Sequence, residues 1–544
     1  MPTYSPNGVR QLPATVNEPV RSYAPGSPER ASLQARLKAM EGERPDIPVV
    51  IDGKEIRHKG STTNATSPHK HRHVTATWHG ATTKDVQAAI ASGRKAWREW
   101  SEWTWEERAS VFLKAADLLA GPWRDTINAA TMLGQSKTVY QSEIDAACEM
   151  TDFFRFNVAF ARELCAEQPI SAPGMWNQSE YRPLEGFVYA VTPFNFTAIG
   201  GNLPTAPALM GNVVLWKPAG AAILSAWHTL QLLHEAGLPP GVINFVPGDP
   251  VEISKVALSH RDLAGVHFTG STGVFNSMWS TIGQNMGKYR SYPRIVGETG
   301  GKDFIIAHPS ADVEAFAVAV VRGAFEYQGQ KCSAASRIYV PKSLWKEVKA
   351  RVVAMLDEIT CGDVSDFSHF MGAVIDKRAF DRISGYLAHA KKNATIIAGG
   401  TADGSKGWFV RPTLVEAKDP KYKLMCEEIF GPVLTAYVYD DAKWAETLEL
   451  VDGTSDYGLT GAVFAQDRAA VREAHAALRH SAGNFYVNDK CTGAVVGQQP
   501  FGGARGSGTN DKAGSKLNLL RWVSARTVKE TFVPAKDYRY PHMG

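Results

Sequence analysis

The sequence predicts an α/β protein in which helices alternate with strands around a mostly parallel, doubly wound sheet. Short apolar runs alternate with helical patterns between residues 181 and 273, and the same rhythm resumes at 304. A chain of 544 residues is also long enough for two or three domains with large cores. The expected strands are 181–191, 213–216, 241–246, 265–269, 304–307, 336–340 and 484–488, with others near 396, 434 and 463.

Composition and charge exclude several classes of function. The chain is 44% hydrophobic and 21% charged, which is ordinary for a globular protein, and its net charge of +4 is mild. It has no block of Lys and Arg and no basic stripe interleaved with aromatic residues, so we expect no nucleic-acid partner. It has no run of eighteen apolar residues, and residues 1–10 lack the apolar core of a secretory signal. We therefore expect a soluble, intracellular protein without a membrane span.

The cysteines and histidines suggest no metal centre. The six cysteines stand at 148, 165, 332, 361, 426 and 491 and form no CxxC pair, which argues against a zinc site and a disulfide framework and suits a reducing compartment. Histidines at 69, 71 and 73 lie in a Ser/Thr/Pro/Gly-rich stretch without acidic or thiol partners. We expect that stretch to be a solvated loop, and we expect no bound metal.

The first part of the chain is expected to be an arm followed by scaffold. Residues 1–46 are rich in Pro, Ser and Arg, with a short helical pattern at 32–40, and we expect them to wrap the body of the protein or a partner. From Thr83 to Cys165 the apolar residues have helical spacing in pieces. Thr83 and Thr104 are the expected N-caps of two of these helices.

Glycine and polar residues follow three of the expected strands: Lys217 and Pro218, Gly248, and Gly270 and Ser271. Because ligands of a doubly wound sheet bind at the carboxyl ends of its strands, these residues are candidates for a nucleotide site. A glycine turn that opens a helix also offers backbone N–H groups to a pyrophosphate. The turns match neither GxGxxG nor a P-loop, so plain strand-to-helix turns stay an equal alternative.

Cys332 follows a short turn rich in Gly and Gln at residues 327–331. A cysteine in such a turn is presented by the backbone, and its polar neighbours are expected to keep the site open, as a reactive thiolate requires. The alternative is a small buried hydrophobe, which is the commoner role of a lone cysteine. We predict that Cys332 is a nucleophile, because several other segments make sense only around such a thiol.

Six short motifs occur in an order that resembles the aldehyde dehydrogenase superfamily. They are Thr-Pro-Phe-Asn-Phe at 192–196, Trp-Lys-Pro at 216–218, Phe-Thr-Gly-Ser at 268–271, Gly-Glu-Thr-Gly-Gly-Lys at 297–302, Gly-Gln-Lys-Cys at 329–332 and Glu-Glu-Ile-Phe-Gly-Pro at 427–432. Within that superfamily, the segments 298–302, 329–334 and 492–503 are most similar to the Δ1-pyrroline-5-carboxylate dehydrogenase family.

The resemblance implies a Rossmann-type NAD-binding domain, an α/β catalytic domain and a small oligomerisation element. That element is expected to pair a hairpin with the C-terminal segment, so the implied assembly is a homo-oligomer, either a dimer or an assembly of dimers. The expected ranges are 1–46 for the arm, 47–297 for the NAD-binding domain with 500–521 returning to it, 298–499 for the catalytic domain, about 171–185 for the hairpin, and 522–544 for the C-terminal segment.

The resemblance also gives each motif a role in aldehyde oxidation. Cys332 is expected to add to the carbonyl carbon, the Asn195 amide to stabilise the resulting oxyanion, and Glu298 to act as the general base that hydrolyses the thioester. For the cofactor NAD, Lys217 is expected to bind the adenosine ribose. Glu428 is expected to bind the nicotinamide ribose, with Phe430 against the nicotinamide ring.

The implied substrate is L-glutamate γ-semialdehyde, oxidised to L-glutamate in proline catabolism. Its α-carboxylate is expected to be held by the backbone N–H groups of Gly493 and Ala494 and by the Ser333 hydroxyl, because small residues leave N–H donors unobstructed. Phe196 and Phe501 are expected to sandwich the aliphatic stem. A plain hairpin turn at Gly493 would explain the glycine but not its pairing with Ser333.

Two departures from the family pattern leave alternatives open. Many relatives carry Ser at the position of Ala494, and many carry an acid after the Lys217 strand, where this chain has Ala-Gly-Ala at 219–221. We expect NAD, with NADP as the alternative cofactor. For the function, the alternatives are a dehydrogenase of another semialdehyde, such as succinate semialdehyde, or a catalytically silent binding or structural member of the fold. For the compartment, we expect the cytoplasm, with the mitochondrial matrix as the alternative.

Overall fold

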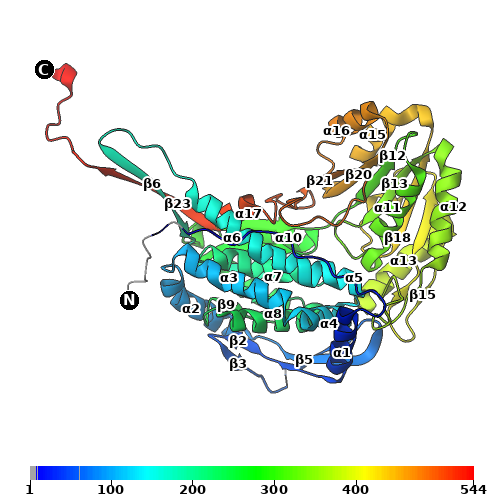
Figure 1. Cartoon of the computed structure of the whole chain (residues 1–544), viewed down its shortest axis with the longest axis horizontal. Coiled ribbons are helices and arrows are strands. Elements are labelled where there is room, and N and C mark those ends of the chain that lie inside the picture. Colours follow the sequence, from blue (N-terminus) through cyan, green and yellow to red (C-terminus); the bar gives the residue numbers. More distant parts are fainter. Residues whose placement is uncertain (1–7, 9, 61) are drawn as a thin grey trace.

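Two seven-stranded sheets form the framework of the protein (Figure 1). The computed structural model describes residues 8, 10–60 and 62–544. In spatial order, the first sheet contains β11 (Arg294–Glu298), β10 (Leu263–Thr269), β7 (Phe187–Val191), β8 (Val213–Lys217), β9 (Ile243–Phe245), β2 (Val49–Ile51) and β3 (Lys54–Ile56). The second contains β14 (Thr395–Ala398), β17 (Thr413–Ala417), β18 (Val433–Tyr439), β13 (Ala335–Pro341), β12 (Asp303–Ala307), β20 (Thr460–Phe464) and β21 (Asn484–Val487).

Both sheets are mostly parallel, as the alternation of strands and helices predicts. In the first sheet the neighbours from β11 to β9 pair in parallel, whereas β2 and β3 add an antiparallel edge. In the second sheet only β14 pairs antiparallel. This arrangement confirms the predicted α/β class, and the antiparallel edges are common on large sheets of this type.

The apolar runs form strands because both of their faces are buried. In β7, Val188 and Ala190 belong to one hydrophobic cluster, whereas Phe187 and Tyr189 on the other face belong to a second. A strand of the second sheet behaves in the same way, since Ile305 of β12 lies in a different cluster from its neighbours in sequence. Because both faces of these strands are buried, their sequences are continuously apolar and do not alternate between apolar and polar residues.

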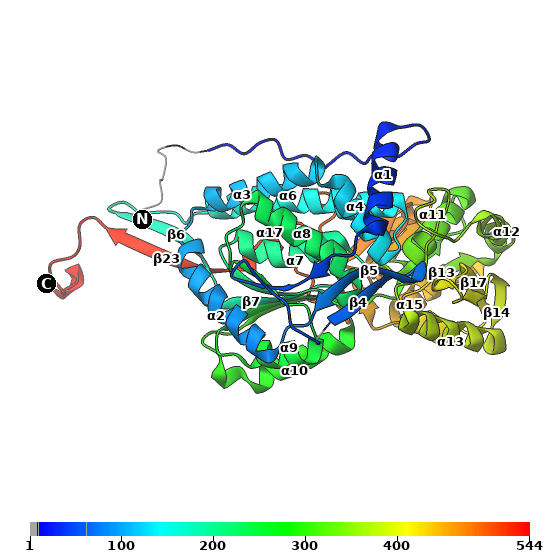
Figure 2. The ribbon, with the colours of Figure 1, turned by 90° about the horizontal axis from the view of Figure 1, so that it is seen from below.

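Helices connect the strands and cover the sheets (Figures 1 and 2). Thr104 caps its helix as predicted, but the cap of the preceding helix is Thr82 instead of Thr83, because the Thr82 side chain accepts from the backbone N–H of Asp85. The helices are α1 (Pro28–Gly42), α2 (Thr83–Trp100), α3 (Trp105–Ala120), α4 (Arg124–Gln135), α5 (Val139–Ser142), α6 (Met150–Ala166), α7 (Thr197–Leu209), α8 (Ile223–Ala236), α9 (Pro250–Ser259), α10 (Thr272–Gln284), α11 (Val313–Phe325), α12 (Lys342–Glu358), α13 (Lys377–Asn393), α14 (Lys423–Cys426), α15 (Trp444–Gly453), α16 (Arg468–Ala477) and α17 (Lys516–Leu520), with a π-helical stretch, η1 (Glu143–Glu149), between α5 and α6.

The chain passes from one sheet to the other within a few residues. Strand β11 ends at Glu298 and β12 begins at Asp303, so the Gly300–Gly301 turn joins the two sheets. The late segment 500–521 comes back to this junction, where the Thr509 hydroxyl accepts from the backbone N–H of Gly297 and Gly508 bridges to Glu298. The expected domain boundaries stay predictions, since a strand order does not by itself fix them.

The histidine-rich stretch is a β-hairpin, so the predicted solvated loop is wrong. Strand β4 (Thr62–Ser67) pairs antiparallel with β5 (Lys70–His79), and β5 also pairs with β1 (Asp46–Ile47). His69, in the turn, is only 2% exposed and lies against Ser67 and Ser136.

Within residues 8, 10–60 and 62–544, no group of three or more His, Cys, Asp or Glu side chains is arranged to hold a metal ion. Among these same residues, no helix has the length and apolarity that a membrane crossing requires.

A two-stranded ribbon projects from the body (Figure 1). It consists of β6 (Met175–Pro183) and β23 (Val523–Thr531), paired antiparallel from Met175 opposite Thr531 to Pro183 opposite Val523. The region at about 171–185 therefore contributes one strand of a hairpin-like ribbon instead of a hairpin of its own, and the C-terminal segment supplies the other. Its role in oligomerisation stays a prediction. The remaining pairs are β15 (Ala402–Asp403) with β16 (Phe409–Val410), and β19 (Tyr457–Gly458) with β22 (Ala504–Arg505).

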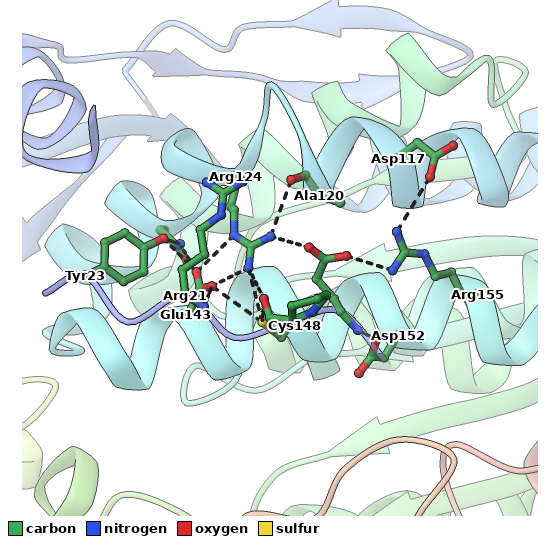
Figure 3. Close-up of polar contacts among 12 residues, drawn as sticks. Arg21, Tyr23, Asp117, Ala120, Arg124, Glu143, Cys148, Asp152 and Arg155 are labelled. Atoms are coloured by element: carbon green, nitrogen blue, oxygen red, sulfur yellow. Dashed lines mark hydrogen bonds and ion pairs between the residues drawn. The ribbon is translucent and has the colours of Figure 1, made fainter. Parts of the chain in front are cut away.

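A buried ion pair holds the helices beneath the N-terminal segment (Figure 3). Arg124 of α4 pairs with Glu143 of η1, and both side chains are almost fully buried. Burial alone would raise the pKa of Glu143, but the hydrogen bond and charge of Arg124 lower it below its usual value. Tyr23 OH and the Asn128 amide also donate to the same carboxylate, at 2.8 and 2.9 Å.

Removing the cation from this pair should destabilise the fold. We expect Arg124→Ala to lower the free energy of unfolding by about 3–5 kcal/mol, because it leaves the Glu143 carboxylate buried without its partner. The measurement is the urea midpoint of both proteins. Arg57→Ala, which removes an exposed pair with Asp46, is the control and should change stability by less than about 1 kcal/mol. Equal, small shifts for the two variants would contradict this expectation.

Candidate active site

Cys332 stands at the end of a tight turn between α11 and β13. Tyr327, Gln328 and Gly329 all adopt left-handed backbone angles, with φ of 51°, 56° and 64°. A Cβ on Gly329 would collide with the carbonyl oxygen of Gly431, so only glycine fits there. Two consecutive left-handed residues other than glycine are unusual and need strong support from their surroundings.

Glutamine side chains supply that support. The Gln328 amide donates to the carbonyls of Ser136 and Ala373, at 3.0 and 2.8 Å, and Gln328 is fully buried. The Gln330 side chain accepts from the backbone N–H of Ile375 at 2.9 Å. The turn is thus fixed to α4, through Ser136 at its C-terminus, and to the segment before α13.

The Cys332 thiol faces a cavity of about 810 Å³. Cys332 is only 8% exposed, so the expectation of an open site is wrong, and the thiol is reached through the cavity instead. Tyr140 and Val20, which are 53% and 49% exposed, also line the cavity, so it extends to the surface. The predicted site residues that line it are Cys332, Glu298, Phe196, Ser333, Gly493, Ala494 and Phe501.

Asn195 lies next to the nucleophile turn. Its side-chain amide donates to the carbonyl oxygen of Gln330 at 3.0 Å, and it is 4% exposed. An Asn amide carries two N–H donors. One of them is engaged by the Gln330 carbonyl, which holds the amide beside the residues just before Cys332.

Burial and negative charge set the protonation of the two reactive groups. Burial, followed by the charges of Asp303, Glu298 and Glu428, raises the pKa of the Cys332 thiol well above its usual value. Burial likewise raises the pKa of Glu298, against a hydrogen bond from the Gly503 N–H at 3.1 Å. Both shifts favour the protonated form of the group, so forming the Cys332 thiolate requires a base close to it.

Glu428 and Phe430 pack around the turn that joins the sheets. The Glu428 carboxylate accepts from the backbone N–H of Gly301 at 2.9 Å, and a Cβ on Gly300 would lie 2.5 Å from it. Phe430 has a left-handed φ of 53° and contacts Phe194 edge-on, with ring centroids 5.8 Å apart. Neither residue lines the Cys332 cavity as Glu298 does, and their cofactor roles stay proposals.

Five of the seven predicted cofactor residues lie at one edge of the first sheet. Lys217 ends β8 and Pro218 follows it, Gly248 follows β9, and Gly270 and Ser271 follow β10. Burial lowers the pKa of Lys217 to about 8, although the charge of Asp249 opposes this. The cavity itself reaches Phe268 and Thr269, the last residues of β10, but none of these five residues lines it.

The helices at this edge differ in how their first N–H groups are satisfied. Asp249 caps α9 and accepts from the N–H groups of Val251 and Glu252. In contrast, no side chain among the described residues caps α10, whose N-cap is Ser271. Free N–H groups at a helix start suit a phosphate, so α10 fits the expected pyrophosphate of a dinucleotide.

The expected carboxylate anchor is assembled from two distant segments. The Ser333 hydroxyl is 2.8 Å from that of Thr492, and both residues are buried. Gly493 follows with φ of 95°, and a Cβ there would lie 2.8 Å from the Lys490 ammonium group. Arg322, Lys331 and Lys490 line the same cavity, and so does Glu326, which pairs with Lys331 at 2.9 Å and leaves Arg322 and Lys490 as the further cations.

No pattern in the sequence indicated that a charged side chain, that of Lys137, is buried beneath the site. Lys137 is fully buried, with its ammonium group 2.6 Å from Asp145 and 4.2 Å from the centre of the Phe196 ring. Asp145 also accepts from the backbone N–H groups of Thr197 and Ala198, both at 2.9 Å, which caps α7. Asp145 lies 52 residues from Thr197, so no local pattern could reveal that it caps the helix after Asn195.

A thiol and a nearby carboxylate in one cavity, with the Asn195 amide bonded to the turn that carries the thiol, beside the edge of a doubly wound sheet, are typical of a dehydrogenase that acts on aldehydes. The model of the aldehyde dehydrogenase family matches residues 56–528, and the chain belongs to this family.

Relatives that match nearly the whole length of this chain show which aldehyde dehydrogenases it is most similar to. The chain is 53% identical over 537 residues to the Δ1-pyrroline-5-carboxylate dehydrogenase, mitochondrial, of Dictyostelium discoideum, covering 98% of this chain and 96% of the relative. It is 51% identical to the human protein of the same name, covering 97% and 94% of the two chains. The crystal structure of the Mycobacterium tuberculosis Δ-pyrroline-5-carboxylate dehydrogenase bound with NAD superposes with a TM-score of 0.96 at 54% identity, covering 99% and 100% of the two chains.

The raised pKa of Glu298 has a consequence for stability. In the unfolded chain a Glu ionises near pH 4.3, whereas the folded protein holds this proton to a higher pH, so stability falls as the pH rises between the two pKa values. We expect Glu298→Gln to remove this loss and to raise the Tm at pH 8 by about 2 °C or more, with no difference near pH 4.

The measurement is thermal unfolding at both pH values. Glu314→Gln, at a side chain that is 78% exposed, is the control and should follow the parent protein at both. A Glu298→Gln protein that is no more stable than the parent at pH 8 would contradict the raised pKa.

Proposed function

We propose that this enzyme uses NAD to oxidise L-glutamate γ-semialdehyde, the open form of Δ1-pyrroline-5-carboxylate, to L-glutamate. The observation that carries the proposal is that one cavity contains both the Cys332 thiol and the Ser333–Thr492–Gly493 anchor. A substrate with an aldehyde at one end and a carboxylate at the other fits such a cavity. The names of the relatives from Dictyostelium and human support the same reaction, and so does the NAD bound in the similar crystal structure from Mycobacterium tuberculosis.

Acylation of the enzyme begins with proton removal from Cys332. Glu298, which lines the same cavity, accepts the thiol proton, and the sulfur adds to the aldehyde carbon. The carbonyl oxygen becomes an oxyanion, stabilised by the Asn195 amide and the Cys332 backbone N–H. Removing one donor of this kind costs about 10²–10³-fold in rate. A bound NAD would supply the acceptor for the hydride of this carbon, and loss of that hydride would leave a thioester on Cys332.

Hydrolysis of the thioester needs a base close to the sulfur. After Glu298 has released the thiol proton to solvent, it takes a proton from water, and the hydroxide adds to the thioester carbon. The carbon–sulfur bond then breaks to release the acid and the Cys332 thiolate, which takes the proton from Glu298. The hydrogen bond from Gly503 holds the Glu298 carboxylate in place. Because burial raises its pKa, Glu298 is a better proton acceptor than an ordinary surface carboxylate.

Recognition of the substrate is assigned to the far end of the cavity. The backbone N–H groups of Gly493 and Ala494 and the Ser333 hydroxyl bind the α-carboxylate, and the rings of Phe196 and Phe501 contact the aliphatic stem. Cationic side chains around this end, Arg322 and Lys490 among them, favour an anionic substrate. Ala494 provides only its backbone N–H, so the anchor has one hydroxyl fewer than a serine there would give.

Most of the residues that we assign to NAD binding lie at the carboxyl ends of strands of the first sheet. Lys217 and Pro218 at the end of β8 bind the adenosine ribose, and Gly248, Gly270 and Ser271 contact the phosphates. Glu428 and Phe430 hold the nicotinamide end. Glu428 is bonded to the Gly301 N–H in the structure, so its carboxylate is already directed at the junction between the sheets.

Assembly and compartment are also proposals. The β6–β23 ribbon bears large exposed apolar side chains, Trp176 at 53% and Val528 at 37%, which supports a role in joining subunits into a dimer or an assembly of dimers. The sequence favoured the cytoplasm. The names of the relatives from Dictyostelium, mouse and human support the alternative, the mitochondrial matrix.

Steady-state kinetics test the proposed reaction directly. We expect kcat/KM with Δ1-pyrroline-5-carboxylate to exceed that with succinate semialdehyde by about tenfold or more, because a site built around polar groups discriminates against a substrate that leaves them unpaired. Rates with NAD are expected to exceed those with NADP. NADH formation, followed by its absorbance, is the readout. A preference for succinate semialdehyde would support the alternative substrate.

The nucleophile has its own test. Cys332→Ala should lower kcat by about 10⁴-fold or more, while NAD binding, measured by isothermal titration calorimetry, should stay close to that of the parent protein. Cys361→Ala, at a free cysteine that does not line the cavity, is the control and should retain activity. Turnover that survives the loss of Cys332 would refute its role as the nucleophile, whereas a parent protein without any turnover would favour the catalytically silent alternative.

A further inference from the structure

An extended segment at the start of the chain lines the substrate cavity. Residues 10–24 precede α1, form no helix or strand among themselves, and run along the body of the protein (Figure 2). Asn17, Glu18 and Val20 of this arm are among the residues that line the cavity. Wrapping the body would not require the arm to reach a cavity, so its position there needs another reason.

Asn17 connects the arm to the loop that carries the carboxylate anchor. Its amide nitrogen donates to Asp152 of α6 and to the carbonyl oxygen of Val496, both at 2.8 Å. Its amide oxygen accepts from the Gln498 side chain at 2.9 Å. One side chain thus joins α6 to residues 492–499, and each of its hydrogen-bonding groups is used.

The loop 492–499 needs such support because it has no helix or strand. It is held near the thiol through Thr492 and Ser333, and it packs so closely on α6 that a Cβ on Gly497 would collide with Phe156. Within the loop, the backbone N–H groups of Gln498 and Gln499 donate to the carbonyl of Val495. The backbone N–H groups of the anchor therefore depend on contacts with other segments for their position.

The arm is itself firmly anchored. Figure 3 shows its contacts with the buried Arg124–Glu143 pair, where the N–H of Arg21 and the OH of Tyr23 donate to Glu143, both at 2.8 Å. The Glu18 carboxylate pairs with Arg124 at 2.5 Å and with Arg155 at 2.8 Å. Because Glu18 is the next residue after Asn17, these contacts fix the position from which Asn17 reaches the loop.

We propose that the N-terminal arm is part of the specificity site: Asn17 is a positioning residue that holds the loop 492–499 where its N–H groups meet the substrate carboxylate. The proposal rests on the proposed function and adds to it a segment more than 300 residues away from Cys332 in the sequence. Asn17 acts through the loop and does not touch the reacting atoms. Its loss should therefore weaken substrate binding and leave the chemical steps intact.

The test compares Asn17→Ala with Val16→Ala, a matched control at the adjacent arm residue, which is 58% exposed. We expect Asn17→Ala to raise KM for Δ1-pyrroline-5-carboxylate about 10-fold or more, since a displacement of about 1 Å can cost about 100-fold in such sites. Its kcat, its KM for NAD and its kcat/KM for propanal, which has no carboxylate, should stay within about twofold of the parent values. Val16→Ala should match the parent in all four.

A second variant approaches the same contact from the loop. Gln498→Ala removes the partner of the Asn17 amide oxygen, so it should also raise KM for Δ1-pyrroline-5-carboxylate, and the double variant should show less than the product of the two single effects. Hydrogen–deuterium exchange of residues 492–499 should be faster in Asn17→Ala than in Val16→Ala. This readout reports the loop itself and does not depend on any substrate.

The outcomes separate the two proposals. If the parent enzyme fails to turn over Δ1-pyrroline-5-carboxylate, the proposed function is wrong, and the exchange experiment still decides whether the arm positions the loop. If exchange of the loop is unchanged in Asn17→Ala, or if KM for propanal rises as much as that for the carboxylate substrate, the role of the arm is refuted. A selective KM increase together with faster loop exchange supports it.

Discussion

The site depends on the turn that carries Cys332 being locked between the two α/β units. Gln328, fully buried, donates to Ser136 at the end of α4 and to Ala373 before α13, and Asn195 donates to the carbonyl of Gln330. These bonds hold two left-handed residues that would otherwise cost about 1–3 kcal/mol each. Because Asn195 is bonded to the turn itself, the nucleophile and the group expected to stabilise its oxyanion keep a fixed relation to each other.

Burial shapes the chemistry of that turn as much as its geometry does. The cavity raises the pKa of both Cys332 and Glu298, chiefly through desolvation. A buried thiol is protected from unwanted reactions at rest, and a carboxylate with a raised pKa is matched to taking its proton. The same desolvation strengthens every polar contact that the substrate makes inside the cavity. Low exposure is therefore part of the mechanism, although an open site was expected for a reactive cysteine.

Selectivity and catalysis are supported by different parts of the molecule. The reacting groups lie at the junction of the two sheets, whereas the proposed anchor loop 492–499 is irregular and contacts the arm, α6 and Ser333. The arm in turn rests on the buried Arg124–Glu143 pair. A chain of hydrogen bonds and ion pairs thus connects the scaffold helices, which looked purely structural in sequence, to the end of the cavity for which we propose substrate recognition.

The sequence by itself determined the α/β class, most strand positions, the family motifs and the identity of the groups around Cys332, because apolar periodicity and short motifs are local signals. It did not determine that the thiol is buried, that His69 lies in a hairpin turn, or that Lys137 and Asp145 lie beneath Phe196. Only the tertiary structure decided these features, and with them the contact from Asn17 to Val496, 479 residues away. Burial and long-range pairing are properties of the packed chain, and no pattern of neighbouring residues encodes which distant side chain will supply a partner.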